Sequence, residues 1–320
     1  MVTNWLAELD GRRVTVEVPA TSANLGAGYD CLGVALGLTN RIQVEVRGWS
    51  RGEIELTVDG EGADELAADR TNRAVQGIET ALHEVRGELP EGVGWRIEMH
   101  NEIPLARGLG SSAAATVGGL VAGNALLGEP LTQADLLRLA TSIEGHPDNA
   151  AAALLGGFTA CAIVDGAVEA LRFDAPRDLR AVLFVPDLRL PTAKMRSALP
   201  AKVPLDDAVA NLTRVAIGVA GMATGRSDLL RVLMVDRLHE PYRAAVYPQL
   251  PQLVEAARKA GAIGACLSGA GSAILAFSDS VRTITRIEAA FGAAAADTDL
   301  TGHITVVSPR NHGAQVIGRA

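Results

Sequence analysis

The sequence predicts a two-domain α+β protein. Its 320 residues exceed one typical domain, and 48% of them are hydrophobic, which is enough to bury a sizeable core. The first hundred residues have mostly the pattern of strands, whereas small apolar residues dominate from Ser111 onward. In the second half, strands and helices follow the order β-α-β-β-α-β with one extra helix, which is the ferredoxin-like pattern. We therefore expect one domain over residues 1–170 and another over residues 171–320.

The N-terminal elements follow from periodicity. Four stretches alternate apolar and polar residues, as strands with one solvated face do: residues 13–18, 41–47, 53–58 and 95–99. A helix over residues 72–85, beginning at Thr71 or Asn72, interrupts them. Small apolar residues, Gly118 and Gly119 among them, predict a buried helix over residues 111–127. Two more helices, the first capped by Thr132, and one strand are expected at residues 132–144, 147–155 and 158–164.

The second half of the chain also alternates segments that have the two-residue period of a strand with segments that have the 3.6-residue period of a helix. The chain passes from the first domain to the second between Asp165 and Arg180. The elements expected after that boundary are a strand at 180–185, helices at 205–223 and 247–259, strands at 263–267 and 273–277, a helix at 281–291 and a strand at 303–307.

Charge and cysteine content narrow the class of partner. With 29 basic and 37 acidic residues, the net charge of −8 argues against nucleic acid or an anionic membrane and leaves a small molecule as the expected partner. Cys31, Cys161 and Cys266 are far apart and have no zinc spacing, so we expect a reducing, cytoplasmic location. No signal peptide or membrane span is expected. A homodimer is the default assembly.

Several common catalytic motifs are absent. The three lysines, Lys194, Lys202 and Lys259, follow Ala, Ala and Arg, so no Walker A loop exists. The sequence also lacks HExxH, the nucleophile elbow GxSxG and the HRD and DFG triplets of protein kinases. Its histidines show no paired metal spacing. These absences exclude the commonest P-loop, zinc-protease and serine-hydrolase sites.

The strongest local signal is the segment PLARGLGSSAAA at residues 104–115. Gly108 and Gly110 allow the backbone to bend close to a ligand, and Ser111 and Ser112 are good N-cap residues before a long apolar helix. Such a loop directs free N–H groups and the positive end of a helix at one point, which favours a phosphate site. A capped glycine turn without any ligand is the alternative.

GLGSSA at residues 108–113 also fits the dinucleotide fingerprint GxGxxA. That interpretation requires a strand running directly into the loop and a second strand ending in an acidic residue. Instead, residues 101–107, with Pro104, intervene, and a second helix follows the first. This pattern disfavours a Rossmann oxidoreductase.

Three further segments combine glycine with polar residues. PATSANLGAGYDCLGVAL at residues 19–36 carries Asn24 and Asp30, and by itself it is compatible with an ordinary capped turn. LSGAGSAILAF at 267–277 by itself predicts a structural hairpin turn. EGHPDN at 144–149 places two carboxylates beside a histidine and an asparagine. Carboxylates next to a phosphate site indicate Mg²⁺, although a charged helix end is an equally good interpretation of the spacing alone.

These segments, in this order, resemble the GHMP kinase superfamily over residues 19–277. PxxxGLGSSAA at 104–114 is similar to its phosphate-binding motif, and SGAGS at 268–272 is similar to its third motif. Within the superfamily, PATSANLGAGYDCLG, EGHPDNAAAALLGG, PTAKMR at 191–196 and LHEPYR at 238–243 most resemble the homoserine kinases. The resemblance implies an N-terminal domain related to ribosomal protein S5, a ferredoxin-like C-terminal domain, and an active site between them.

The resemblance also implies an activity and the residues that perform it. The activity is phosphoryl transfer from ATP, with Mg²⁺, to the side-chain hydroxyl of L-homoserine in threonine biosynthesis. ATP contacts are implied at Asn72, near the nucleobase, and at Pro104, Gly108, Leu109, Gly110, Ser111, Ser112 and Ala113. The Mg²⁺ ligands implied are Ser112 and Glu144. Substrate contacts are implied at Asn24, Asp30, His146, Thr192, Arg196, Arg243 and Gly269, with Asp30 facing the ammonium and the two arginines facing the carboxylate.

Asp148 and Asn149 are the expected catalytic pair. Asp148 either takes the hydroxyl proton as a general base or, with Asn149, only orients the hydroxyl for direct transfer. Two alternative functions stay open: another GHMP kinase acting on a mevalonate-like or other acidic alcohol, and a homologue that binds ligands without catalysis.

Overall fold

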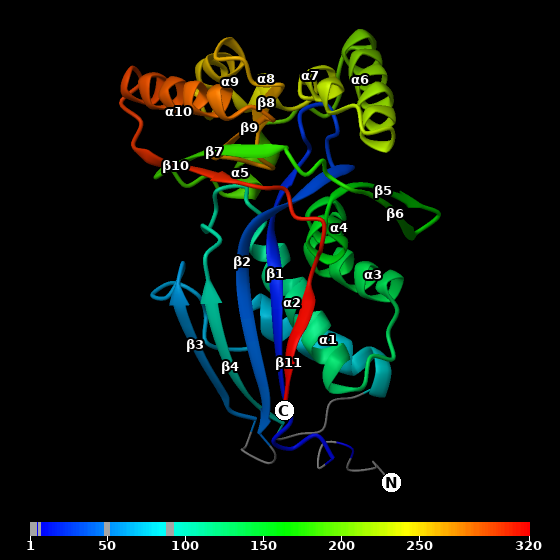
Figure 1. The fold of residues 1–320 in the computed structure, drawn as a ribbon. Coiled ribbons are helices and arrows are strands. Elements are labelled where there is room, and N and C mark those ends of the chain that lie inside the picture. The colour runs from blue at the N-terminus through cyan, green and yellow to red at the C-terminus, as the bar shows by residue number, and fades with distance from the viewer. Residues whose placement is uncertain (1–4, 6–7, 48–51, 88–92) are drawn as a thin grey trace.

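Two β-sheets organise the chain in the computed structural model, which describes residues 5, 8–47, 52–87 and 93–320 (Figure 1). One sheet has seven strands and the other has four within this described part. The buried apolar side chains form two clusters: one spans the first sheet and one face of the second sheet, and the other lies on the opposite face of the second sheet. The α+β prediction is confirmed.

The first sheet has the strand order β11-β1-β2-β4-β3, with β5 joining β2 and β6 joining β5. All its neighbouring strands are antiparallel except β3 and β4. In the second half of β2, from Asn40 onward, buried residues alternate with partly exposed ones as the period-two pattern predicts, except at the buried Glu45, whereas residues 32–36 are all buried. The strands are β1 (Arg13–Ala23), β2 (Leu32–Arg47), β3 (Ile54–Gly60), β4 (Gly94–Asn101), β5 (Phe158–Val164), β6 (Ala167–Phe173) and β11 (Gln315–Arg319).

Helices α1 to α4 pack together in the first domain, and α2 approaches α1 so closely that their backbones are in contact. A Cβ on Gly119 of α2 would lie 2.1 Å from the carbonyl oxygen of Ala74 in α1, and a Cβ on Gly77 would lie 2.4 Å from that of Thr116. Only glycine allows this approach, which confirms the predicted tight packing of this helix. The helices are α1 (Arg73–Arg86), α2 (Ser111–Leu126), α3 (Gln133–Glu144) and α4 (Asp148–Leu155).

The second sheet has the order β10-β7-β9-β8, which is four-one-three-two along the chain and is the ferredoxin-like arrangement. Helices α9 and α10 pack together against it (Figure 1). The strands are β7 (Arg180–Pro186), β8 (Gly264–Leu267), β9 (Ile274–Ser278) and β10 (Gly302–Val307). The helices are α5 (Thr192–Ser197), α6 (Leu205–Ala223), the 3₁₀ turn η1 (Ser227–Leu229), α7 (Leu230–Leu233), α8 (Glu240–Arg243), α9 (Leu250–Lys259) and α10 (Val281–Ala296).

Most predicted elements are present, but their edges differ. β1 continues through Pro19 to Ala23, and β2 begins at Leu32, so the presumed turn of residues 19–36 is mainly strand. A register shift between Pro19 and Ala20 accommodates the proline within the ladder. The predicted pattern did not include β6, β11 or the short helices α5, α7 and α8. These helices have only four to six residues, which is less than two turns and too short to show a helical period.

The chain returns to its first sheet at the end. β11 pairs antiparallel with β1, and Figure 1 shows this segment running from the second domain down along the first. The domain boundary at residue 170 stays a prediction. β11 lies after that boundary in the sequence but belongs to the sheet of the first domain. In the part of the chain described by the structure, none of the helices has the length and apolar character needed to cross a membrane.

Candidate functional site

A cavity of about 300 Å³ lies where the two domains meet. It collects residues from segments far apart in the sequence: the loop before α2, the turn after β1, the start of α4, and helices α5 and α8. Except for Asn72, every residue expected at the site lines this cavity: Asn24, Asp30, Pro104, Gly108, Leu109, Gly110, Ser111, Ser112, Ala113, Glu144, His146, Asp148, Asn149, Thr192, Arg196, Arg243 and Gly269.

The N-terminus of α2 opens into this cavity. Gly110 is the N-cap residue with φ 71°, and none of the residues that the structure describes caps the helix through its side chain. The expectation that Ser111 and Ser112 act as caps is therefore wrong, because they are the first two helical residues. Without a capping side chain, the first N–H groups of α2 and the positive end of its dipole are left for an anion.

The segment after β8 supports the phosphate loop from behind. Ser268 Oγ donates to the carbonyl oxygen of Gly108 at 2.7 Å, and the Ala273 N–H donates to that of Arg107 at 2.9 Å. A Cβ on Gly108 would lie 2.1 Å from the Ser268 carbonyl oxygen. The hairpin interpretation of residues 267–277 was thus incomplete, because this turn fixes the loop that carries the helix start.

Replacing Gly110 by alanine should weaken nucleotide binding at least tenfold. Its φ of 71° strains any L-residue, and its Cβ would lie 1.9 Å from Thr21 Oγ1, which cannot move without disturbing Asn149. Binding of a fluorescent ATP analogue measures the effect. Gly128→Ala is the matched control, because Gly128 has φ 83° and open space around its Cβ position. Equal losses in both variants would mean that backbone strain alone, not the loop's contacts, explains the result.

Glu144 lies at the end of α3 and faces the start of α2. Its Oε1 accepts hydrogen bonds from Ser112 Oγ at 3.0 Å and Thr116 Oγ1 at 2.6 Å. Arg73 Nε lies 3.8 Å from the same oxygen. The two residues expected to bind Mg²⁺, Ser112 and Glu144, are therefore adjacent in the fold.

Asp148 is buried at the first turn of α4, with a relative exposure of 2%. Its Oδ1 accepts from His146 Nδ1 at 2.9 Å, from the Asn149 backbone N–H at 2.7 Å and from Asn149 Nδ2 at 3.4 Å. None of the described residues donates to Oδ2. The hydrogen bond to Asp148 raises the pKa of His146. Thr21 Oγ1 donates to Asn149 Oδ1 at 2.8 Å, which fixes that amide.

Asp30 and Arg196 pair with each other across the cavity. Arg196 Nη2 and Nη1 donate to the two carboxylate oxygens at 2.6 and 3.0 Å, and Nη1 also donates to the Tyr29 hydroxyl at 3.0 Å. The hydrogen bond that Arg196 donates to Asp30 raises the pKa of Arg196. Thr192 begins the same helix one turn earlier. The groups expected to meet the substrate's ammonium and carboxylate neutralise each other in this structure.

Arg243 is almost fully buried, with a relative exposure of 1%. Its Nη1 donates to the Gly269 carbonyl oxygen at 2.9 Å and to His239 Nδ1 at 3.0 Å. Burial lowers the pKa of Arg243. Asn24 Nδ2 donates to the same Gly269 oxygen at 2.9 Å, and Asn24 Oδ1 accepts from the Asp30 N–H. Asn24 and Gly269 thus hold together the loop of residues 24–31 between β1 and β2, called the binding loop below, as well as lining the cavity.

Asn72 lines a second cavity, of about 440 Å³, which shares Arg73, Ala106, Ser111 and Ser112 with the first. Asn72 Oδ1 caps α1 by accepting from the Ala74 N–H, and its Nδ2 donates to the Ala67 carbonyl oxygen. Of the two predicted starts, Thr71 and Asn72, the structure has Asn72 as the N-cap. Its side-chain amide is committed to the fold at both ends.

Three residues of the site were missed. Tyr29 places its ring 5.6 Å from the Arg196 guanidinium and 5.5 Å from that of Arg243. Arg107 lines the cavity while its side chain donates to the carbonyl oxygens of Leu105, Pro186 and Asp187. Arg73 lines both cavities.

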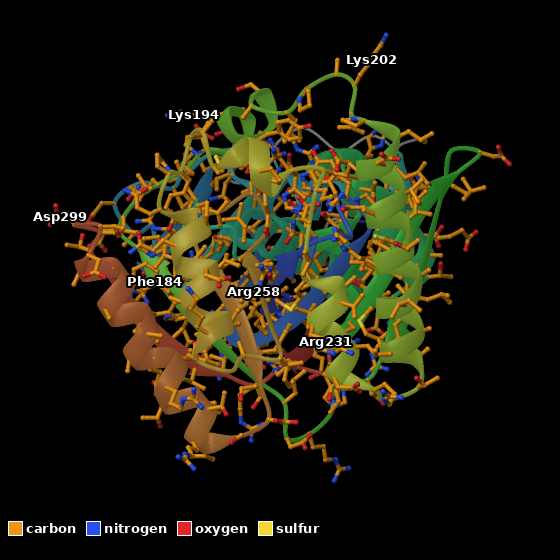
Figure 2. The ribbon with its side chains drawn as sticks, turned by 90° about the horizontal axis from the view of Figure 1, so that it is seen from above. Phe184, Lys194, Lys202, Arg231, Arg258 and Asp299 are labelled. Atoms are coloured by element: carbon orange, nitrogen blue, oxygen red, sulfur yellow. The ribbon has the colours of Figure 1, made fainter. Side chains whose placement is uncertain are left out.

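Arg73 could have been predicted from its position in the sequence. It is the first residue of α1, where a positive charge opposes the helix dipole, so an anionic ligand is a natural reason for it. Lys194 and Lys202 do not supply a positive charge to the site, because both are exposed and lie at the rim of the molecule in Figure 2. Arginine therefore supplies the cations of the site.

Comparison with known proteins covers both domains. The family model of the GHMP kinases N terminal domain matches residues 72–157, and that of the GHMP kinases C terminal matches residues 219–297. A homoserine kinase of Moorella thermoacetica is 43% identical over 302 residues, 94% of this chain and 99% of that protein. A homoserine kinase of Symbiobacterium thermophilum is 49% identical over 244 residues, 73% of this chain and 74% of that protein.

Solved structures of kinases are also similar to this chain. The crystal structure of homoserine kinase from Cytophaga hutchinsonii superposes with a TM-score of 0.85 at 30% identity, covering 95% of this chain and 97% of that one. The L. major mevalonate kinase shares the fold, with a TM-score of 0.67 at 18% identity over 92% of this chain and 95% of that one. The parallel sheet of a dinucleotide-binding fold is absent from the described residues, since β3 and β4 form the one parallel pair.

Proposed function

The chain belongs to the homoserine kinase family of the GHMP kinases, and we propose that it transfers the γ-phosphoryl group of ATP to the side-chain hydroxyl of L-homoserine, forming O-phospho-L-homoserine and ADP. One structural observation supports this proposal independently of the family. The start of α2, an anion site, faces a cavity whose other wall holds Asp30, Arg196 and Arg243. These groups suit a substrate that carries an ammonium and a carboxylate.

ATP spans the two cavities in this proposal. They meet at Arg73, Ser111 and Ser112, so the triphosphate lies at the start of α2 and the nucleobase lies in the larger cavity beside Asn72. Since the amide of Asn72 is already bonded, its contribution there is to shape the wall. Arg73 adds a positive charge next to the phosphates.

The residues at the end of α3 fit Mg²⁺. Carboxylate and hydroxyl oxygens are hard ligands of the kind that Mg²⁺ prefers. Ser112 Oγ and Glu144 Oε1 are 3.0 Å apart. Mg²⁺ usually takes few protein ligands and completes its shell with phosphates and water, so one carboxylate and one hydroxyl are sufficient. When bound, the ion would neutralise phosphate charge.

L-Homoserine enters between the two arginines in this proposal. Its carboxylate accepts from the buried guanidinium of Arg243 and from Arg196, which exchanges part of its pairing with Asp30 for the substrate. Asp30 then faces the ammonium. Thr192 and His146 line the space that leads to the hydroxyl.

The reaction asks the protein mainly to orient groups and to stabilise spreading charge. Asn149, fixed by Thr21, and Asp148, fixed through Oδ1, orient the substrate hydroxyl toward the phosphorus atom. Oδ2 of Asp148 accepts the hydroxyl proton as the new oxygen–phosphorus bond forms and the bond to the ADP oxygen breaks. The N–H groups at the start of α2 hold the phosphate oxygens throughout.

Coupled release of ADP tests the function. L-Homoserine with Mg²⁺ and ATP should give saturable, stoichiometric ADP formation, whereas mevalonate and galactose should give background rates. Turnover of mevalonate instead would favour the alternative of another GHMP kinase. ATP binding with no turnover of any substrate would favour a ligand-binding homologue. An NAD-dependent absorbance change without ATP use would contradict the kinase function and would indicate an oxidoreductase instead.

According to this proposal, the enzyme lies in the cytoplasm and its product is an intermediate of threonine biosynthesis. The three cysteines Cys31, Cys161 and Cys266 are free, which supports a reducing compartment. Burial raises the pKa of Cys31 to about 11 and of Cys161 to about 12, so both thiols stay protonated and unreactive at neutral pH.

A further inference from the structure

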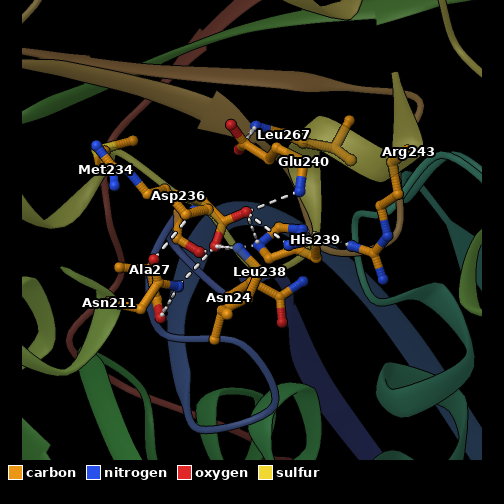
Figure 3. Close-up of polar contacts among 12 residues, drawn as sticks. Asn24, Ala27, Asn211, Met234, Asp236, Leu238, His239, Glu240, Arg243 and Leu267 are labelled. Carbon is orange, nitrogen blue, oxygen red and sulfur yellow. Dashed lines mark hydrogen bonds and ion pairs between the residues drawn. The ribbon is translucent and has the colours of Figure 1, made fainter. Parts of the chain in front are cut away.

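A fully buried histidine lies directly behind the cavity. His239 has no exposed surface and precedes α8, the short helix that carries Arg243 (Figure 3). Asp236 holds this segment by accepting from the N–H groups of Leu238, His239 and Glu240 at 2.7 to 3.0 Å. The histidine ring therefore occupies a fixed position.

The hydrogen bonds of His239 determine its tautomer. Arg243 Nη1, 3.0 Å from Nδ1, can only donate, so Nδ1 must be an acceptor. The proton then lies on Nε2, which donates to the Gly26 carbonyl oxygen at 2.8 Å. Burial lowers the pKa of His239 to about 4, which agrees with a neutral ring. Both nitrogens are engaged, one with the substrate arginine and the other with the binding loop.

Asn211 of α6 and Leu233 of α7 hold the binding loop at a second point. Asn211 Nδ2 donates to the Ala27 carbonyl oxygen at 3.1 Å and to Asp236 Oδ1 at 2.7 Å. The Ala27 N–H donates to the Leu233 carbonyl oxygen at 3.0 Å. A loop fixed on both Gly26 and Ala27 has little freedom to shift, and this loop leads directly to Tyr29 and Asp30.

The aromatic ring of Tyr29 joins the two halves of the site. It lies 5.3 Å from the His239 ring and faces the guanidiniums of Arg196 and Arg243. His239 is thus in contact with Tyr29, bonded to Gly26 and bonded to Arg243. These contacts link the wall expected to bind the ammonium to the arginine expected to bind the carboxylate.

We propose that His239 is a positioning residue that aims the guanidinium of Arg243 and sets its distance from the Asp30 loop, so that the enzyme selects alcohols bearing both an ammonium and a carboxylate. This inference rests on the proposed function and adds a cause of substrate selectivity. The buried imidazole acts through Arg243 and does not itself touch the substrate.

Two substitutions separate the two hydrogen bonds of the ring. Glutamine places a donor near the position of Nε2 but has no acceptor at Nδ1, so His239→Gln keeps the Gly26 bond and loses the Arg243 bond. Asparagine places an acceptor near Nδ1, so His239→Asn does the reverse. The matched substrate is 3-aminopropan-1-ol, which has the hydroxyl and ammonium of homoserine but no carboxylate.

The measured quantity is the preference for homoserine over 3-aminopropan-1-ol, as a ratio of kcat/KM values or of inhibition constants. His239→Gln should lower this ratio at least tenfold, with KM for ATP unchanged, whereas His239→Asn should keep it within threefold. A role in stability alone would weaken both ligands equally, and that result, or an unchanged ratio in His239→Gln, overturns the proposal. Failure of the wild type to use homoserine would instead overturn the proposed function.

Nitrogen NMR of the histidine-labelled wild type provides a test that needs no folded glutamine variant. The His239 signals, identified by their absence in His239→Asn, should report a neutral ring with the proton on Nε2 between pH 5.5 and 8. A charged ring or a proton on Nδ1 contradicts the proposal, because neither form can accept from Arg243.

Discussion

Replacing Arg243 by alanine should raise KM for L-homoserine about 100-fold and leave KM for ATP within threefold. Arg243 is buried, and Gly269 and His239 fix one of its terminal nitrogens. Removing one partner of a buried, hydrogen-bonded charge pair costs about 2–5 kcal/mol, and each 1.4 kcal/mol is about tenfold in affinity. Steady-state kinetics with each substrate varied in turn measures the split.

Arg243→Lys is the matched variant, because it keeps the charge and loses the planar fork. It should fall between the wild type and the alanine variant. Thermal melting shows whether the cavity left by alanine destabilises the fold. If the KM for ATP rises as much as that for homoserine, the arginine acts through stability and the carboxylate role is wrong.

Replacing Asp148 by asparagine should lower kcat about 100-fold, with both KM values within a few-fold of the wild type. A positioned general base contributes about 10²–10⁴-fold, and an amide cannot take the hydroxyl proton. Oδ1 is committed to His146 and Asn149, so the charge and the lone pairs of Oδ2 are what the substitution removes from the cavity. Single-turnover measurements with bound ATP isolate the chemical step.

Thr21→Val is the control for orientation, because it removes the hydroxyl that donates to Asn149 Oδ1 and leaves Asp148 intact. We expect a loss of about tenfold or less in this variant, following the modest value of one neutral hydrogen bond. Near-normal turnover by Asp148→Asn, together with a larger loss in Thr21→Val, would show that the pair only orients the hydroxyl.

The phosphate loop could be predicted because its signal is local. Gly108, Gly110 and the small residues after them specify a turn and a helix start without any distant partner. The resemblance then brought Asp30, Arg196 and Arg243 to the same expected site, and all three line one cavity. Regular helices and strands followed from their period for the same local reason.

Features that depend on distant partners could not be predicted. Tyr29 is one aromatic residue in a loop until the fold places two guanidiniums against its ring. His239 stands in a motif, but its role depends on Gly26, more than two hundred residues earlier in the chain. The serine cap was wrong because Gly110, at positive φ, itself occupies the N-cap position, so Ser111 and Ser112 are already helical.

The pairing of β11 with β1 has a consequence for synthesis of the protein. Residues 315–319 are synthesised after all the other strands of the sheet whose edge they complete. During translation the outer side of β1 is an unpaired edge, the kind of surface that recruits foreign strands or chaperones. The nascent first domain therefore waits for the whole second domain before its own hydrogen-bond ladder is closed.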